Sequence, residues 1–191
     1  METTPLFDSY YFREVTPNEI NAFYSEHVEK VFADDIYMDV YEWLTTEEKQ
    51  KQQDLAGLVK DKYRLSILIY NGEEAIGWHF GWQVDEENYY MCNTGILQAY
   101  QGKGIYSALL PKLIQIFKDK GFQKITSTHH APNNAILVPK LKAGFVITGF
   151  DINEQFGLRV VLSYIFNEKR LNAYKFRIGS LRPDEDMKKY L

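Results

Sequence analysis

The sequence predicts a single mixed α/β domain whose sheet is mostly antiparallel, and three observations support this fold class. Helical periodicity dominates residues 1–64, whereas residues 65–97 change to short apolar segments separated by polar turns. An amphipathic helix at residues 105–120 then lies between two strand-like segments, which is typical of a right-handed crossover between parallel strands. The length of 191 residues suits one domain with its own core.

The N-terminal third is expected to be helical after one short strand. Residues 10–15 are aromatic and β-branched, which favours a strand. Residues 16–19, TPNE, form a capping box with proline at the first helical position, so a helix is predicted over residues 17–32. Apolar residues keep the helical period through residues 36–44. A second capping signal, threonine followed three residues later by glutamate, opens a polar helix over residues 45–62.

A strand-rich region follows. Residues 65–70 and 75–84 are predicted strands joined by an Asn-Gly turn at residues 71–72, and residues 89–97 complete an antiparallel meander. The amphipathic helix over residues 105–120 ends at a glycine. Beyond it, the sequence predicts a strand, a short helix and two further strands at residues 124–129, 133–143, 145–151 and 158–166.

Composition excludes several classes of protein. No apolar run approaches the roughly 20 residues that a membrane helix needs, and residues 1–8 carry no basic or apolar leader, so neither a membrane partner nor secretion is expected. The single cysteine, Cys92, cannot form an internal disulfide, which favours a reducing cytoplasm. No zinc-ligand spacing is present, so no metal is predicted. The pI of 5.6, without a dense basic cluster, argues against nucleic acid.

The net charge of −4 hides an asymmetry between the two halves. Residues 1–100 hold 7 Lys and Arg against 19 Asp and Glu, whereas residues 101–191 hold 15 against 7. A basic half suits a polyanionic ligand, and an acidic half attracts a cation. Alternatively, charges of both signs intermix on the folded surface, and the sequence leaves the two interpretations open.

The segment that indicates chemistry is QGKGIY, residues 101–106, between a predicted strand and the amphipathic helix. Its glycines allow a ligand to approach the backbone, and the first turn of the helix offers unpaired N–H groups to a phosphate. Leu97 stands where a Walker loop needs glycine, and Ser107 stands where a dinucleotide fingerprint needs its third glycine, so both motifs are excluded. A glycine-rich turn without a ligand is the alternative.

These residues resemble the GNAT superfamily of N-acetyltransferases. The acyl-CoA loop of that superfamily reads Gln/Arg-x-x-Gly-x-Gly/Ala; Gln101 and Gly104 match it, whereas Tyr106 replaces the final small residue. Its second CoA segment, an asparagine, a short helix and a Gly-Phe pair, is similar to residues 133–145. The ordered set of segments, spanning residues 65–166, is more specific than the loop alone.

The resemblance implies an architecture and a cofactor. The expected fold is a mixed, mostly antiparallel sheet with helices on both faces and a central parallel strand pair splayed around acyl-CoA. Residues 1–166 would form one domain, with an acceptor-side helical part at 1–64 and an acyl-CoA-binding core at 65–166, and residues 167–191 would form a helical or mobile tail. Acetyl-CoA would be the acyl donor. The residues expected to bind it are Gly95, Ile96, Leu97, Gln101, Gly102, Lys103, Gly104, Ile105, Tyr106 and Asn133.

The activity implied by the resemblance is transfer of an acetyl group to a primary amine of a small molecule or peptide by direct attack. Ile96 stands at the expected strand bulge, and a backbone N–H at Ile96 or Leu97 would polarise the thioester carbonyl. Many members protonate the leaving thiolate with a tyrosine from the helix after the asparagine. Lys140 stands at the corresponding place here, so the usual acid is missing.

Residues on the two splayed strands are candidates to replace the missing catalytic acid. His129 and His130 end the second strand, and histidine titrates near neutral pH; solvent-facing imidazoles at a strand end are the alternative. Tyr90 and Cys92 share a face of the first strand and would face the cleft or the buried core. Cys92 is not expected to be a nucleophile, because nothing in the sequence indicates a paired histidine or a lowered pKa.

The sequence is compatible with three functions. The first is a cytoplasmic acyl-CoA-dependent N-acyltransferase, for which the acidic N-terminal half favours a cationic amine acceptor. The second is a non-catalytic acyl-CoA-binding module of the same fold, suggested by Lys140 and Tyr106. The third is an interaction domain that has lost the cofactor. A monomer and a homodimer are both compatible with the sequence.

Overall fold

The computed structural model describes residues 3–33, 39–57, 61–183 and 185–189. The strands are β1 Thr3–Phe7, β2 Tyr10–Glu14, β3 Arg64–Asn71, β4 Glu74–Gln83, β5 Asn88–Ile96, β6 Lys124–His130, β7 Val146–Asn153 and β8 Gly157–Ile165. The helices are α1 Pro17–Val31, α2 Thr46–Gly57, α3 Ile105–Asp119, α4 Asn134–Lys142, α5 Glu168–Arg177 and α6 Glu185–Lys188, with short 3-10 helices η1 Val40–Trp43 and η2 Gln98–Tyr100.

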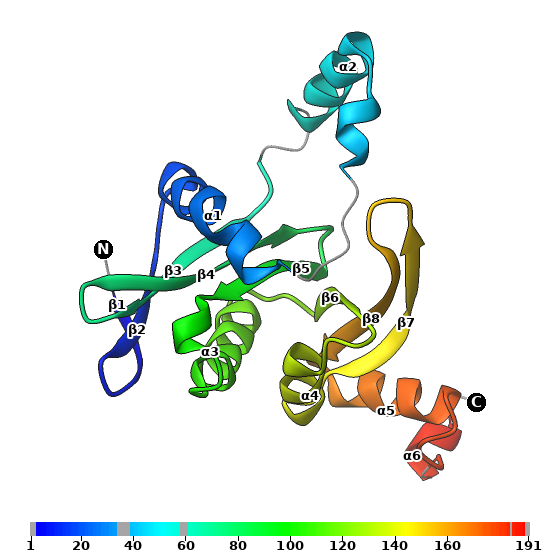
Figure 1. Ribbon diagram of the computed structural model, residues 1–191. Helices are drawn as coiled ribbons and strands as arrows, with labels where there is room; N and C mark the ends of the chain where they lie inside the picture. Colours follow the sequence, from blue (N-terminus) through cyan, green and yellow to red (C-terminus); the bar gives the residue numbers. More distant parts are fainter. Residues whose placement is uncertain (1–2, 34–38, 58–60, 184, 190–191) are drawn as a thin grey trace.

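The described strands form one sheet in the order β1-β2-β3-β4-β5-β6-β8-β7. All neighbouring strands are antiparallel except β5 and β6, which are parallel. The mixed, mostly antiparallel sheet with a central parallel pair is therefore confirmed, and so is the meander of β3, β4 and β5. Figure 1 shows α2 projecting away from the sheet and α3 and α4 packed beside it.

Two apolar clusters cover the two faces of the sheet. Alternate residues of β3 divide between them, because successive strand side chains point to opposite faces. Ile67 and Ile69 join the larger cluster, which includes α3, whereas Leu68 and Tyr70 join the smaller cluster with α1. Helices thus pack on both faces, as expected, and burial on both sides explains why β3 is a continuous apolar run.

The N-terminal region confirms one prediction and extends another. Thr16 and Glu19 form the capping box, in which the Thr16 N–H donates to the Glu19 carboxylate at 2.8 Å, and α1 begins and ends within one residue of its predicted bounds. Strand β1 was not predicted. It lies at the edge of the sheet, where Pro5, which has no N–H to donate, is tolerated.

The segment between α1 and β3 is less helical than predicted. Residues 40–43 form a 3-10 turn, because the Asp39 carboxylate accepts a hydrogen bond from the Tyr41 N–H at 3.1 Å and starts a new element. The helical period expected at Ile36 lies outside the described residues. Helix α2 ends at Gly57 rather than near residue 62.

The C-terminal segment contains a helix that packs on the sheet. Asn167 caps α5 by accepting a hydrogen bond from the Arg170 N–H at 3.0 Å. The Arg170 guanidinium donates to the Glu87 carboxylate at 2.9 Å, and the Tyr174 hydroxyl donates to the Ile147 carbonyl of β7. Residues 168–177 of the predicted tail are therefore helical. None of the helices in the described ranges is long and apolar enough to cross a membrane.

Candidate active site

Strands β5 and β6 pair over a short length and then separate. Residues 88–90 pair with residues 124–126, whereas β5 continues to Ile96 and β6 to His130 without further pairs between them. The space between residues 91–96 of β5 and residues 127–130 of β6 is called the gap below. The separation begins beside a β-bulge at Cys92, which has no partner in β4 although the residues on either side are paired. The prediction of splayed strands is confirmed, but the bulge lies at Cys92 and not at Ile96.

A cavity of about 600 Å³ lies at the end of β5 where the strands have separated. Its walls come from β5, the following loop, the first turn of α3 and the start of α4, with two residues from the end of α1. The predicted binding residues that line it are Gly95, Ile96, Gln101, Gly102, Gly104, Ile105, Tyr106 and Asn133. Two predicted residues, Leu97 and Lys103, do not line it. The remaining lining residues are Val31, Phe32, Thr94, Tyr100, Ser107, Ala135, Ile136 and Pro139.

The loop before α3 has the backbone geometry that its glycines suggest. Gly102 and Gly104 have φ angles of +74° and +81°, which residues with a side chain rarely adopt. Within the described part of the chain, no atom lies within 4 Å of a Cβ built on either glycine, so both border open space. Helix α3 begins immediately after Gly104, and its first N–H groups have no acceptor within the helix. An anionic group fits at this helix end.

Side-chain contacts connect this loop to the neighbouring strands. The Gln101 Nε2 donates to the Ile96 carbonyl at 2.9 Å, which closes the loop onto the end of β5. The Tyr100 hydroxyl donates to the Glu74 carboxylate at 2.6 Å, and the Lys103 ammonium lies 4.8 Å from the centre of the Tyr100 ring. Lys103 is exposed, so its charge lies at the outer side of the loop.

The two backbone N–H groups considered for carbonyl polarisation are not equivalent. The Leu97 N–H donates to the Ile76 carbonyl of β4 at 2.9 Å, so it is already paired and the expectation for Leu97 is corrected. Successive N–H groups along a strand point to opposite edges. The Ile96 N–H therefore points to the other edge of β5, which faces the gap left by β6.

A polar cluster lies beneath the gap, on the face that α4 covers. Lys140 of α4 is buried, and its Nζ donates to the Ser127 Oγ at 2.6 Å. The same Nζ lies 3.1 Å from the His129 Nε2, which lies 3.0 Å from the Ser127 Oγ. Ser127 and His129 share a face of β6 because they are two residues apart.

Lys140, and not His129, titrates near neutral pH in this cluster. Burial, followed by the nearby Lys140 charge, lowers the pKa of His129 to about 2, so the expectation that His129 titrates near neutral pH was wrong. Burial lowers the pKa of Lys140 to about 7. Lys140 therefore titrates in the range where acid–base catalysis at neutral pH operates. A lysine within the apolar stretch ILVPKL was the sequence signal for it.

The other candidate residues lie at or near the same gap. The Tyr90 hydroxyl is 2.7 Å from the Thr128 Oγ1 and so joins β5 to β6 where their backbones separate; burial raises the pKa of Tyr90. The His130 ring packs edge-on against Phe156, with centroids 6.3 Å apart. Burial raises the pKa of the Cys92 thiol to about 12, which agrees with the expectation that it is not a nucleophile.

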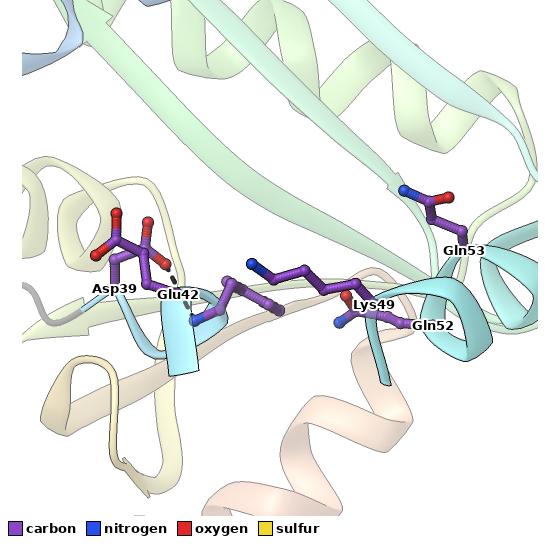
Figure 2. A pocket seen from close by; sticks show the side chains of 6 residues that line it. Asp39, Glu42, Lys49, Gln52 and Gln53 are labelled. Carbon is purple, nitrogen blue, oxygen red and sulfur yellow. Dashed lines mark hydrogen bonds between the residues drawn. The ribbon is translucent and has the colours of Figure 1, made fainter. Parts of the chain in front are cut away.

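A second cavity, of about 330 Å³, lies at a different place in the fold. Its lining residues, Asp39, Tyr41, Glu42, Lys49, Gln52 and Gln53, come only from η1 with its preceding residue and from α2. Figure 2 shows the Lys49 side chain extending toward Asp39 and Glu42. The second cavity shares no lining residue with the first cavity or with the gap. Within the described ranges, no group of three or more His, Cys, Asp and Glu side chains is placed to hold a metal ion.

The larger cavity fits an acyl-CoA molecule. Its volume lies within the range of small-molecule sites, roughly 300–1,000 Å³. The two glycines and the start of α3 suit a pyrophosphate, because they combine open space with unpaired N–H groups. The unpaired edge of β5 suits an extended chain that carries an amide and a thioester.

Comparisons with known proteins agree with this geometry. The sequence model of the acetyltransferase (GNAT) family matches residues 27–145, from within α1 to the residue before β7. No curated protein sequence matches the chain.

Several solved structures have the same fold. The ribosomal-protein-S5-alanine acetyltransferase from Vibrio fischeri has a TM-score of 0.64 over 88% of this chain and 98% of its own, with 17% identity. An acetyl transferase from Salmonella typhimurium that modifies the N-terminal serine of ribosomal protein L7/L12 has a TM-score of 0.59 over 87% and 100%, with 16% identity. A GNAT family acetyltransferase from Elizabethkingia anophelis with acetyl-CoA bound has a TM-score of 0.58 over 84% and 100%, with 17% identity.

Proposed function

This chain belongs to the acetyltransferase (GNAT) family, whose acyl donor is acetyl-CoA, and on that premise we propose that it acetylates a primary amine of a peptide or small molecule. When bound, acetyl-CoA supplies an acetyl group that is activated as a thioester. Direct attack by the amine forms the C–N bond and breaks the C–S bond. A route through an acyl-cysteine is disfavoured, because the buried Cys92 thiol stays protonated at neutral pH.

One observation carries this proposal: the cavity at the start of α3 adjoins the gap between β5 and β6. Residues 94–96 belong both to the cavity wall and to the part of β5 that lies beyond its last pair with β6. Gly102, Gly104 and the first turn of α3 would hold the pyrophosphate. The Ile96 N–H would orient the thioester carbonyl and polarise it as its oxygen gains charge.

The acceptor is proposed to approach from the face of the sheet opposite α3 and α4, because these two helices cover the face on which the Lys140 cluster lies. On that opposite face, the rings of Tyr90 and Trp82 are 5.6 Å apart, and Tyr24 of α1 packs edge-on against Phe80 at 5.3 Å. Aromatic faces attract cations. Together with the acidic residues of the N-terminal half, they favour a cationic amine.

The acceptor class can be narrowed by a panel of amines. Two of the similar structures are named as acetyltransferases of ribosomal proteins, one as an S5-alanine acetyltransferase and one as modifying an N-terminal serine, so peptides that begin with alanine or serine belong in the panel. Cationic polyamines and neutral and anionic amino acids complete it. The matched control is each peptide with its N-terminus already acetylated.

The assay measures thiol release from acetyl-CoA together with the mass of the product. We expect a free amine to be turned over and to gain the mass of one acetyl group. The peptide with a blocked N-terminus should not react. CoA binding without turnover of any amine would instead favour the alternative, a non-catalytic acyl-CoA-binding module. Acetylation restricted to neutral or anionic amines would contradict the preference for a cation.

A further inference from the structure

Lys140 is a buried cationic side chain without an acidic partner. Its exposed fraction is 1%, and no Asp or Glu among the described residues forms an ion pair with it. Burying an ammonium group without a carboxylate costs stability, whereas a methionine of similar length would fill the same space without that cost. Packing alone therefore does not explain a lysine at this position.

Lys140 has close contacts with two polar atoms and a longer contact with a sulfur atom, so its three ammonium donors are not all held by strong acceptors. The Nζ donates to the Ser127 Oγ at 2.6 Å, lies 3.1 Å from the His129 Nε2 and lies 3.9 Å from the Met91 Sδ. Its distance from the centre of the Phe145 ring is 5.1 Å. Met91 belongs to β5 and Ser127 to β6, so the Nζ lies between the two strands that separate.

The part of the cavity wall that α4 forms and the Lys140 Nζ lie on the same face of the sheet. Ile136 and Pro139 of α4 line the cavity, and Lys140 is the next residue along that helix. On the β5 side, Thr94 lines the cavity, and its hydroxyl is 2.8 Å from the Nδ1 of the buried His79. Polar side chains therefore extend from Thr94 in the cavity wall to the cluster of Ser127, His129 and Lys140 beneath the gap.

We propose that Lys140 donates a proton to the sulfur atom that leaves acetyl-CoA, with Ser127 and His129 positioning its Nζ beneath the gap. The proposal rests on the proposed function and adds the group that completes the reaction. As the C–S bond breaks, sulfur accepts a proton from the Nζ, which is left as a neutral amine. The attacking nitrogen loses one proton in forming the amide, and that proton, transferred through water, restores the ammonium group.

The charges around Lys140 are consistent with this role. His129 on β6 and His79 on β4 face it, and burial is the main cause that lowers their pKa values, to about 2 and about 3, so both are neutral at pH 7. Arg159 on β8 forms an ion pair with Asp151 on β7 at 2.6 Å. The charges of Arg159 and His130 are smaller causes of the lowered pKa of His129. Burial lowers the pKa of Lys140 to about 7, so its ammonium can release a proton at neutral pH.

The decisive measurement follows the thiol of bound CoA, the reaction product, and does not depend on turnover. An ammonium group beside a thiol lowers the thiol pKa, by about 1–3 units for an opposite charge within a few ångströms, and the thiolate in turn raises the pKa of the ammonium group, so the two groups titrate as a coupled pair. The thiolate absorbs in the far ultraviolet, so its fraction can be titrated against pH in the protein–CoA complex. The variants compared are Lys140→Met, Lys140→Arg and, as the matched control, Lys142→Met, which removes an exposed lysine from the same helix.

The expected result is a thiol pKa for bound CoA that is at least about one unit lower in the wild type and Lys142→Met than in Lys140→Met. Lys140→Arg keeps the lowered thiol pKa but loses turnover by roughly 10²-fold, because arginine does not release its proton. Lys140→Tyr, whose phenol titrates near pH 10, regains part of the turnover, and its alkaline limb moves to higher pH.

Two results would overturn the proposal, and they are distinguishable. If CoA binds equally to the wild type and Lys140→Met and its thiol titrates identically in both, Lys140 does not act on the sulfur, although the proposed function stands. If CoA does not bind the folded wild type, the proposed function fails as well. If Lys140→Met does not fold, the pH dependence of turnover in Lys140→Arg and Lys140→Tyr is compared with that of the wild type instead. NMR titration of ¹³C-labelled lysine in the wild type, with and without CoA, then shows whether the Lys140 pKa responds to the thiol.

Discussion

A Cβ atom built on Gly95 would lie 2.2 Å from the Cζ2 of Trp78, so the end of β5 can pair with β4 only if residue 95 has no side chain. Trp78 is fully buried, and its Nε1 donates to the Asn93 Oδ1 at 2.8 Å. Rings of Phe23 and Tyr24 from α1 pack edge-on against it. This contact fixes the wall of the cofactor cavity relative to α1.

The first prediction concerns that contact. Gly95→Ala should destabilise the protein by roughly 1–3 kcal/mol, because the methyl group forces Trp78 or the strand to move. Denaturant unfolding measures the change in the free energy of unfolding. The control is Gly149→Ala in β7, where a Cβ meets no atom of the described residues within 4 Å and φ is not positive. Equal stability of the two variants would contradict the packing argument.

The second prediction concerns closure of the cofactor loop. Gln101→Ala should weaken acetyl-CoA binding several-fold, because it removes the hydrogen bond to the Ile96 carbonyl that holds the loop against β5. The cost in stability should not exceed about 1 kcal/mol, since the side chain is exposed. Calorimetric titration with acetyl-CoA gives the affinity. Gln115→Ala, which removes a side-chain bond to Asp119 within α3, should leave the affinity unchanged.

The third prediction follows from the buried histidines. The pKa of His79 is lowered to about 3 by burial, whereas an unfolded histidine titrates near 6.5. Between these values the unfolded state binds more protons, so stability falls as pH falls, by up to about 1.4 kcal/mol per pH unit. His79→Phe should reduce that slope between pH 6.5 and 4, as measured by urea unfolding. An unchanged slope would mean that the folded state tolerates the charged imidazole.

The fourth prediction separates the two faces of the gap. Tyr90→Phe should raise the KM for the amine and leave acetyl-CoA affinity unchanged, because Tyr90 shares a face with Trp82, opposite the cavity. Thr128→Val removes the other half of the 2.7 Å contact and should give a similar change. If the double variant is no worse than either single variant, the two groups act together. Weaker acetyl-CoA binding in Tyr90→Phe would place the residue on the cofactor side instead.

Local signals were sufficient to predict most elements. The capping box of Thr16 and Glu19, the Asn-Gly turn that contains Gly72 and the glycines around α3 act within a few residues, so their structure can be predicted from the sequence. Strand β1 could not be read in this way. Pro5 disfavours a strand locally, and only its edge position in the sheet makes the strand possible.

The site was predictable in its cofactor loop and less so in its acid–base groups. Loop residues such as Gly104 follow a motif, whereas the pKa of a group depends on its surroundings. The ordinary titration range of histidine favours His129 as a catalytic group, but burial, followed by the nearby Lys140 charge, lowers its pKa out of that range. The bulge at Cys92 depends on pairing with β4, which strand alternation alone does not reveal.

The central claim is that acetyl-CoA binds in the cavity at the start of α3. The most direct test is thermal unfolding with and without acetyl-CoA, for the wild type and for Gly104→Val. Ligand at 100 times its Kd should raise the Tm of the wild type by roughly 5–10 °C. The shift should be absent from the folded variant, because valine occupies the open space beside α3. No shift for the folded wild type at millimolar acetyl-CoA, or the same shift in both proteins, would contradict the claim.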